Sequence, residues 1–161
     1  MSTAEDRKKV VDLLNQGRAA ELTAIMQYMA HHYELEDADY GKLAKAMKTI
    51  AIQEMDHAEQ LAERILYLEG TPTSDPDGKV TRDKDIAAML KRDVALEQGA
   101  VEMYNASAMQ CGQAGDHTSK RLFQQLLADE EAHLDEFQNI ESHLEKLGDA
   151  YLATLTGGEA E

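Results

Sequence analysis

Apolar residues recur every three or four positions along four long stretches of this 161-residue chain. This period is typical of amphipathic α-helices that bury one face. In the second stretch the repeat runs through Leu43, Met47, Ile50, Leu61 and Ile65. The pattern predicts four long helices and a short fifth one, over residues 4–35, 38–69, 83–112, 116–147 and 149–155.

The breaks between these stretches predict how the helices are connected. Both prolines, Pro72 and Pro76, lie in the one long loop signal of the chain, residues 70–79. At roughly 3.3 Å per residue, the segment 70–82 extends to about 40 Å, close to the length of a helix of about 30 residues. The loop can therefore cross from one end of the helices to the other and make the second and third helices parallel. The predicted fold is an all-α four-helix bundle with a long crossover loop.

The shorter breaks predict tight turns and helix caps. One break falls at residues 35–40, and the other, at 112–116, contains two glycines and then Asp116, which is suited to an N-cap. Ser2 and Glu5 have the spacing of a capping box, so we expect Ser2 to begin the first helix. We expect one domain over residues 1–161, because this length supports a single core.

Composition narrows the classes of function. The chain has 31 acidic and 16 basic residues, a formal net charge of −15 and a pI of about 4.7. This balance argues against nucleic acid or anionic membranes as partners and suits a protein that handles cations. No apolar run is long enough to span a bilayer, and residues 1–9 do not resemble a secretory signal, so a cytoplasmic location is expected. The single cysteine, Cys111, excludes an internal disulfide framework, and we assign it no chemistry.

Charged residues fill the middle of the apolar stripes, where a core would have apolar side chains. Four carboxylates and two imidazoles are expected to meet at one level of the bundle. Buried carboxylates without compensation are strongly destabilising, so this layer needs a partner of opposite charge. The six residues are Glu21, Glu54, His57, Glu97, Glu130 and His133.

The spacing of these residues shows an internal repeat. The pattern Glu-x6-Tyr-x25-Glu-x2-His occurs twice, offset by the 76 residues that separate Glu21 from Glu97. The repeat predicts one helical hairpin used twice around a pseudo-twofold axis. The two copies are Glu21, Tyr28, Glu54, His57 and Glu97, Tyr104, Glu130, His133.

The repeated motif predicts a dinuclear metal site. A Glu and a His three positions apart on a helix point the same way, and two such pairs with one further Glu from each remaining helix supply six ligands for two metals. Four carboxylates balance two divalent ions, and mixed oxygen and nitrogen ligands suit iron or manganese. A lone Glu-x-x-His is usually a solvated helix face, but two matched copies on core stripes reverse that interpretation.

Several other residues are open at this stage. Tyr28 and Tyr104 are either hydrogen-bond donors behind the ligands or plain core residues. Four histidines have no matched partner in the repeat, so we expect them at the surface or in local packing. They are His31, His32, His117 and His143.

At these motifs the chain resembles the bacterioferritins, the haem-bearing branch of the ferritin superfamily. The resemblance covers the four helices, the crossover loop, both Glu-x-x-His motifs and a terminal helix containing Tyr151. Ordinary ferritins resemble it less, because they typically lack the histidine of the second motif. The resemblance implies that the six residues are ferroxidase ligands for two iron ions per subunit, with Glu54 and Glu130 bridging the ions.

The resemblance also implies a function and an assembly. Ferrous iron would be oxidised by O2 or H2O2, and the ferric product would be stored as a mineral inside a hollow homo-oligomeric shell of 24 subunits built from dimers. This would serve iron storage and detoxification. An electron-donor protein for iron release would be a further partner.

Met55 is singled out by the same resemblance. In bacterioferritins the Met at this place is the axial ligand of an iron porphyrin (haem) shared between two subunits. Met55 lies about 100° of helical rotation from Glu54, off the core stripe and near Ala51, Ile52 and Ala62. The alternative is a Met that fills a dimer interface without haem.

The chain departs from part of the family at an accessory iron site. Some members carry a His and an Asp on the inner surface, where this chain has Thr49 and Gln53. The route by which iron or electrons leave the dinuclear centre therefore stays open.

Two alternatives to ferroxidase chemistry remain. The first is a di-metal peroxidase, catalase or oxygenase of the rubrerythrin type. A rubrerythrin normally carries an additional Cys-x-x-Cys domain, which one cysteine cannot form, and an oxygenase needs a substrate pocket. The second is a helical scaffold that holds metal only structurally.

Overall fold

The structure is a computed structural model that describes residues 3–83 and 85–158. All regular elements in this part of the chain are helices, as predicted, and no described helix combines the length and apolar character that a membrane crossing requires. The five helices are α1 (Ala4–Asp37), α2 (Gly41–Tyr67), α3 (Ile86–Gln113), α4 (His117–Leu147) and α5 (Asp149–Thr154).

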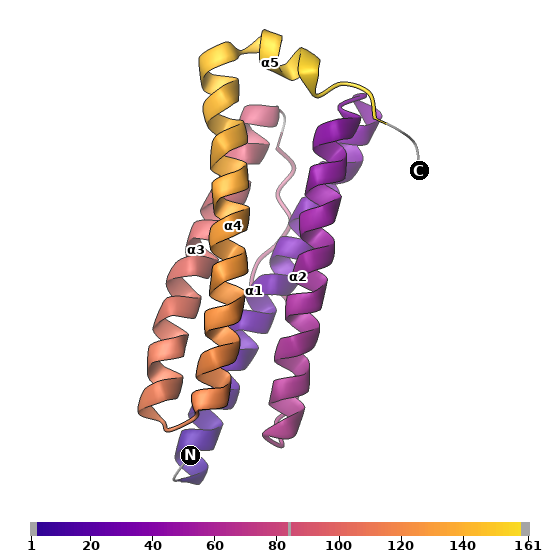
Figure 1. Cartoon of the computed structure of the whole chain (residues 1–161). Helices are drawn as coiled ribbons and strands as arrows, with labels where there is room; N and C mark the ends of the chain where they lie inside the picture. The colour runs from indigo at the N-terminus through magenta and orange to yellow at the C-terminus, as the bar shows by residue number, and fades with distance from the viewer. Residues whose placement is uncertain (1–2, 84, 159–161) are drawn as a thin grey trace.

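The long helices form two antiparallel hairpins, α1–α2 and α3–α4, which pack into one bundle (Figure 1). The segment between α2 and α3 runs the length of the bundle, so α2 and α3 point in the same direction. The predicted crossover is therefore confirmed. The short α5 lies across the end of the bundle, where the chain after it contacts the α1–α2 turn through a hydrogen bond from Gly157 N to Asp39 O (2.9 Å).

The crossover loop has no regular structure, yet polar side chains of α1 hold it along its length. Asn15 accepts from Thr73 N (2.8 Å), and Gln27 both donates to Thr81 O and accepts from Thr81 N (2.9 Å each). These bonds satisfy backbone groups that a helix or strand would otherwise pair. The α1 residues that hold the loop are Asn15, Arg18, Thr23, Gln27 and His31.

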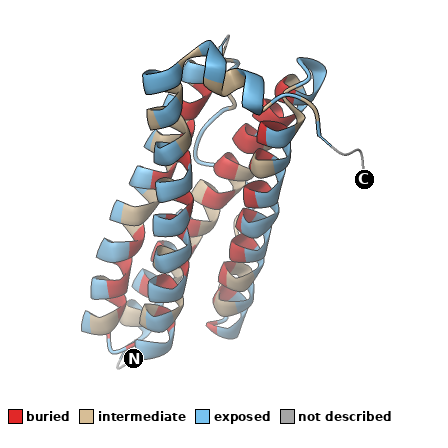
Figure 2. Ribbon diagram, turned by 45° about the horizontal axis from the view of Figure 1, so that its top comes forward, coloured by how far each residue is buried: buried red, intermediate tan, exposed pale blue. Residues whose placement is uncertain are grey.

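Two apolar clusters fill the bundle, and a layer of charged residues lies between them. Buried residues face the bundle axis and exposed residues cover the outside (Figure 2). In each cluster a buried tyrosine packs against a phenylalanine of α4, with ring centroids 5.4 Å apart. These pairs are Tyr104–Phe123 in the first cluster and Tyr28–Phe137 in the second.

The predicted helix boundaries need small corrections. The N-cap of α1 is Thr3 and not Ser2: Thr3 Oγ1 accepts a hydrogen bond from Asp6 N (3.0 Å), while Ser2 itself lies outside the described residues. The third helix begins at 86 because Asp85 caps it by accepting from Ala88 N (2.7 Å). The predicted N-cap at Asp116 is correct, since its side chain accepts from Ser119 N (2.9 Å).

Candidate metal centre

The six charged residues of the repeat come together in the middle of the bundle. They come from all four long helices, and each is at most 4% exposed. Potential donor atoms from two sets of four residues lie within 4.8 Å of one another. We call the first set the His57 position and the second the His133 position. Their members are Glu21, Glu54, His57, Glu130 and Glu54, Glu97, Glu130, His133.

Glu54 and Glu130 belong to both sets, so they can bridge two metal ions. Both imidazoles turn the same nitrogen toward these carboxylates. His57 Nδ1 lies 2.8 Å from Glu54 and 3.0 Å from Glu130, and His133 Nδ1 lies 3.0 Å from Glu54 and 3.3 Å from Glu130. The two rings stack with centroids 5.9 Å apart. In both histidines Nδ1 is therefore the nitrogen that faces the two shared carboxylates.

The two remaining carboxylates are held by the two tyrosines of the repeat. Tyr28 OH donates to Glu97 (2.5 Å), and Tyr104 OH donates to Glu21. Each tyrosine thus ties a carboxylate from the opposite hairpin while its ring fills the apolar core. The two roles left open by the sequence therefore occur together.

Burial and mutual repulsion disturb the titration of the carboxylates. Burial, followed by the charge of Glu54, raises the pKa of Glu21 well above its usual value, and burial likewise raises the pKa of Glu97. Burial also acts against ionised Glu130, but a hydrogen bond from His133 helps to outweigh it, so the pKa of Glu130 is lowered. Burial opposes the charged form of His133 as well, yet its carboxylate partners raise its pKa to about 9.

The cluster fits divalent cations. Glu97 Oε2 is buried without a hydrogen-bond partner, which is costly for a carboxylate oxygen. Without metal, protons must supply the positive charge that the layer needs. Two divalent cations would supply that charge directly and would complete the oxygen and nitrogen ligand sets.

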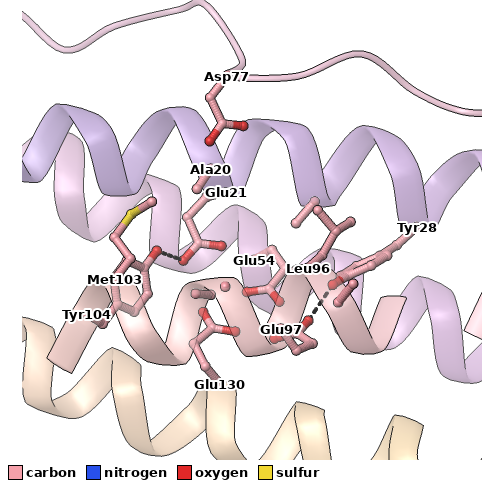
Figure 3. A pocket seen from close by; sticks show the side chains of 14 residues that line it. Ala20, Glu21, Tyr28, Glu54, Asp77, Leu96, Glu97, Met103, Tyr104 and Glu130 are labelled. Carbon is pink, nitrogen blue, oxygen red and sulfur yellow. Dashed lines mark hydrogen bonds between the residues drawn. The ribbon is translucent and has the colours of Figure 1, made fainter. Parts of the chain in front are cut away.

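A cavity of about 160 Å³ opens beside the cluster, between α1 and α3. Figure 3 shows Glu21, Glu54 and Glu130 converging there, with Asp77 of the crossover loop above them. Pockets for organic ligands usually enclose about 300–1,000 Å³, so this cavity suits an ion, a water molecule, O2 or H2O2. The substrate pocket that an oxygenase needs is therefore not found at this site.

Each site histidine has a second hydrogen-bond partner on its other ring nitrogen, and the sequence analysis did not predict these contacts. His57 Nε2 lies 3.0 Å from Asp129 Oδ2, and His133 Nε2 lies 2.7 Å from Gln53 Oε1. Asp129 directly precedes Glu130, and Gln53 directly precedes Glu54, the two carboxylates that both sets share. The 76-residue offset relates these two positions as well, so the repeat contained a signal for them.

The prediction that His31 lies at the surface or in local packing is wrong, because it pairs with residues far away in the sequence. Its ring is fully buried, with Nδ1 3.0 Å from Asp93 and Nε2 3.0 Å from Asp83, which in turn accepts hydrogen bonds from Arg92. His32 is also buried, where its Nδ1 donates to Ala44 O (2.7 Å).

His117, His143 and Met55 lie at the surface, as expected. The histidines that remain, His117 and His143, are exposed, and His143 packs against Tyr151. Met55 lies on the outer face of α2 and is 55% exposed beside the similarly exposed Ile52, whereas Ala51 is buried and does not belong to this patch. Cys111 is buried, and burial raises its thiol pKa to about 12, so it is an inert core residue.

Comparison with known proteins identifies relatives of this fold and site. A family model of the ferritin-like domain matches residues 11–147. The chain is 47% identical over 154 residues to a bacterioferritin of Desulfovibrio desulfuricans, covering 95% of this chain and 86% of that one. It is 35% identical over 153 residues to a bacterioferritin of Brucella melitensis, covering 95% of each.

Solved structures agree with the sequence matches. The X-ray structure of the Desulfovibrio desulfuricans bacterioferritin, described with its diiron site in different catalytic states, superposes with a TM-score of 0.93 at 43% identity and covers 98% of this chain and 95% of that one. Mycobacterium tuberculosis bacterioferritin BfrA superposes with a TM-score of 0.89 at 30% identity, covering 92% of this chain and 94% of that one. With its fold, its repeated Glu-x-x-His motifs and these relatives, the chain belongs to the bacterioferritin family.

Proposed function

We propose that this protein is a cytoplasmic iron-storage ferroxidase, folded as one ferritin-like domain over residues 1–161. Each subunit binds two ferrous ions as substrate at the His57 and His133 positions. The observation that carries the proposal is that two four-residue donor sets share Glu54 and Glu130 in a buried layer. The ferric product is stored in a hollow shell of 24 copies built from dimers.

The residues of the site bind the ferrous ions and limit the size of the oxidant that can reach them. Two ferrous ions lose one electron each, and one H2O2 accepts both electrons with two protons and becomes two water molecules; O2 accepts the same electrons and protons and becomes H2O2. Tyr28 and Tyr104 fix the non-bridging carboxylates, and the adjoining cavity admits only small oxidants. The net charge of −15 attracts ferrous ions to the protein.

Rapid mixing of the metal-free protein with two ferrous ions per subunit tests this function. Glu130→Ala removes a donor shared by both positions and should abolish the rapid phase of iron oxidation. Glu131→Ala, which removes the exposed neighbouring carboxylate, is the matched control and should oxidise iron at the wild-type rate. A Glu130→Ala protein with an undiminished rapid phase would show that the site assignment is wrong.

The assembled mass separates this function from the rubrerythrin-type alternative. A storage shell requires a native mass near 24 times the chain mass of 17.9 kDa and a mineral core that grows with added iron. A dimer or tetramer that turns over peroxide without accumulating mineral would favour the di-metal peroxidase instead.

Met55 is the proposed axial ligand of a haem shared by two subunits. Its thioether and the side chain of Ile52 lie on the surface of the single chain, so a symmetric contact on this face would bring two copies of Met55 together. Two thioethers favour electron transfer by the bound iron porphyrin, which would serve iron release with an electron-donor protein. Met55→Leu should lose the porphyrin absorption, whereas Met109→Leu, at an exposed Met on α3, should keep it. A porphyrin spectrum unchanged by Met55→Leu would contradict this assignment.

A further inference from the structure

The rear nitrogen of each site histidine has a different kind of partner. Asp129 accepts from His57 Nε2 (3.0 Å) with a carboxylate, whereas Gln53 accepts from His133 Nε2 (2.7 Å) with an amide. The front nitrogens, by contrast, face the same kinds of group, although His57 Nδ1 lies 3.4 Å from Glu21 and His133 Nδ1 lies 3.9 Å from Glu97. Both face Glu54 and Glu130.

The rest of the immediate ligand set is also matched between the two positions. Each has one non-bridging glutamate, and each of those glutamates accepts from a buried tyrosine of the other hairpin. Directly behind the imidazoles, one half of the site has an amide where the other half has a carboxylate.

This difference affects metal binding through the imidazole. A carboxylate that accepts the Nε2 proton increases the electron density at Nδ1 and fixes the tautomer with Nδ1 free for a metal. An amide oxygen is a weaker acceptor. It therefore increases the electron density at Nδ1 less and fixes the tautomer less firmly. Removing such a partner typically costs 10-fold to 100-fold in metal affinity. Because the side chain of Asp129 is 59% exposed, we expect the lower end of this range.

We propose that Asp129 and Gln53 are positioning residues that make the two metal positions unequal, so that the His57 position fills before the His133 position. The proposal rests on the proposed function, since it requires that both positions bind metal. The difference in affinity is expected to be about 10-fold. Gln53 thereby sets the weaker position, which controls when both substrate ions are present together.

Calorimetric titration of the metal-free protein with cobalt(II) tests the inequality without iron oxidation. The wild type should bind one ion per subunit tightly and a second about 10-fold more weakly. The isosteric variant Gln53→Glu should strengthen the weak class and bring the two together. Asp129→Asn should weaken the tight class and leave the other unchanged.

The variant Gln124→Glu is the control for the negative charge that Gln53→Glu adds. Gln124 is exposed on α4, and the change adds the same negative charge without a contact to either imidazole; both affinities should stay at wild-type values. Two equal classes in the wild type, or equal shifts of both classes in Gln53→Glu, would overturn the inference. A protein that binds no cobalt in the core would instead contradict the proposed function, because the metal positions would then not exist.

Discussion

The two helical hairpins carry the same motif but present different surfaces. Among the described residues, the α1–α2 hairpin exposes six large apolar side chains, whereas the α3–α4 hairpin exposes two. The first hairpin therefore leaves more apolar side chain in contact with solvent in the single chain than the second. The exposed residues are Met26, Tyr33, Ile52, Met55, Leu66 and Tyr67 on the first hairpin, and Met109 and Leu147 on the second.

The hairpins also differ inside the bundle, directly behind the tyrosines. Near Tyr28 the buried pair His31–Asp93 joins α1 to α3. The 76-residue offset relates these two residues to Ser107 and Gly17, which have no charge. The repeat is thus conserved in the residues that face the metal positions and broken one layer away. The site residues can therefore be the same in both hairpins while the residues that pack around them differ.

The largest expected effect on stability comes from removing one partner of the buried His31–Asp93 pair. His31→Ala leaves the Asp93 carboxylate buried and unpaired, which should lower the free energy of unfolding by about 3–5 kcal/mol. Ser107→Ala, at the related position of the other hairpin, unpairs no charge and should cost much less. Chemical denaturation of both variants compares the two ends directly. Equal losses would show that the His31–Asp93 pair contributes nothing special.

The contribution of His31 to stability should depend on pH in a defined direction. Burial lowers the pKa of His31, but its bonds to Asp93 and Asp83 outweigh burial, so the net pKa is raised above about 6.5. A group with a raised folded pKa stabilises fully below its unfolded pKa, and this contribution is lost as the pH rises through the folded pKa. Burial raises the pKa of Asp93 itself to about 6, so the comparison uses the double variant His31→Ala/Asp93→Ala, which lacks this carboxyl. The stability difference between wild type and the double variant should shrink as the pH increases from 6.5. A constant difference from pH 6.5 to 9 would contradict a protonated His31.

These residues also show what the sequence could and could not predict. The helices and the six site residues were predictable because helical periodicity is local and the motif occurs twice. The partners of His31 lie 52 and 62 residues away, and no spacing rule connects an α1 histidine with a loop or α3 carboxylate. The same holds for the crossover loop, whose path depends on individual hydrogen bonds to α1. Asp129 and Gln53 were predictable in part: the repeat relates their positions, but only the structure shows that they contact the histidines.

Metal binding should stabilise both hairpins together and more strongly at higher pH. The pKa values of Glu21 and Glu97 are raised in the metal-free fold, so the stability that these two carboxyls contribute is fully present below about 4.5 and is lost as the pH rises through their raised values. Cobalt(II) at one fixed concentration, about 100 times the dissociation constant at pH 7.5, should add about 2.7 kcal/mol per occupied position at that pH. Thermal unfolding at pH 5.5 and 7.5, with and without cobalt, should show the larger protection at pH 7.5. Equal protection at both values would argue against protonated carboxylates in the metal-free cluster.

Replacing two helical glycines by alanine should change the stability of the fold in opposite directions. A Cβ at Gly17 would lie 3.1 Å from the Tyr104 ring and 3.3 Å from the Phe123 ring, whereas a Cβ at Gly99 would meet nothing within 4 Å. Gly17→Ala should therefore destabilise the fold by about 1–3 kcal/mol through overpacking. Gly99→Ala should stabilise it by about 0.5–1 kcal/mol, because it restricts the unfolded chain. Denaturation midpoints that move in the same direction would contradict this distinction.

The smallest expected effects concern the first residue of each hairpin, where the two halves should behave alike. Thr3 caps α1 by accepting from Asp6 N, and Asp85 caps α3 by accepting from Ala88 N. Each side chain satisfies one backbone donor that the first turn leaves unpaired. Thr3→Ala and Asp85→Ala should each lower the free energy of unfolding by about 1 kcal/mol, and Thr3→Ser should restore most of the loss. If Asp85→Ala costs several times more than Thr3→Ala, the start of α3 contributes more than a cap, and the hairpins differ at their ends as well as behind the tyrosines.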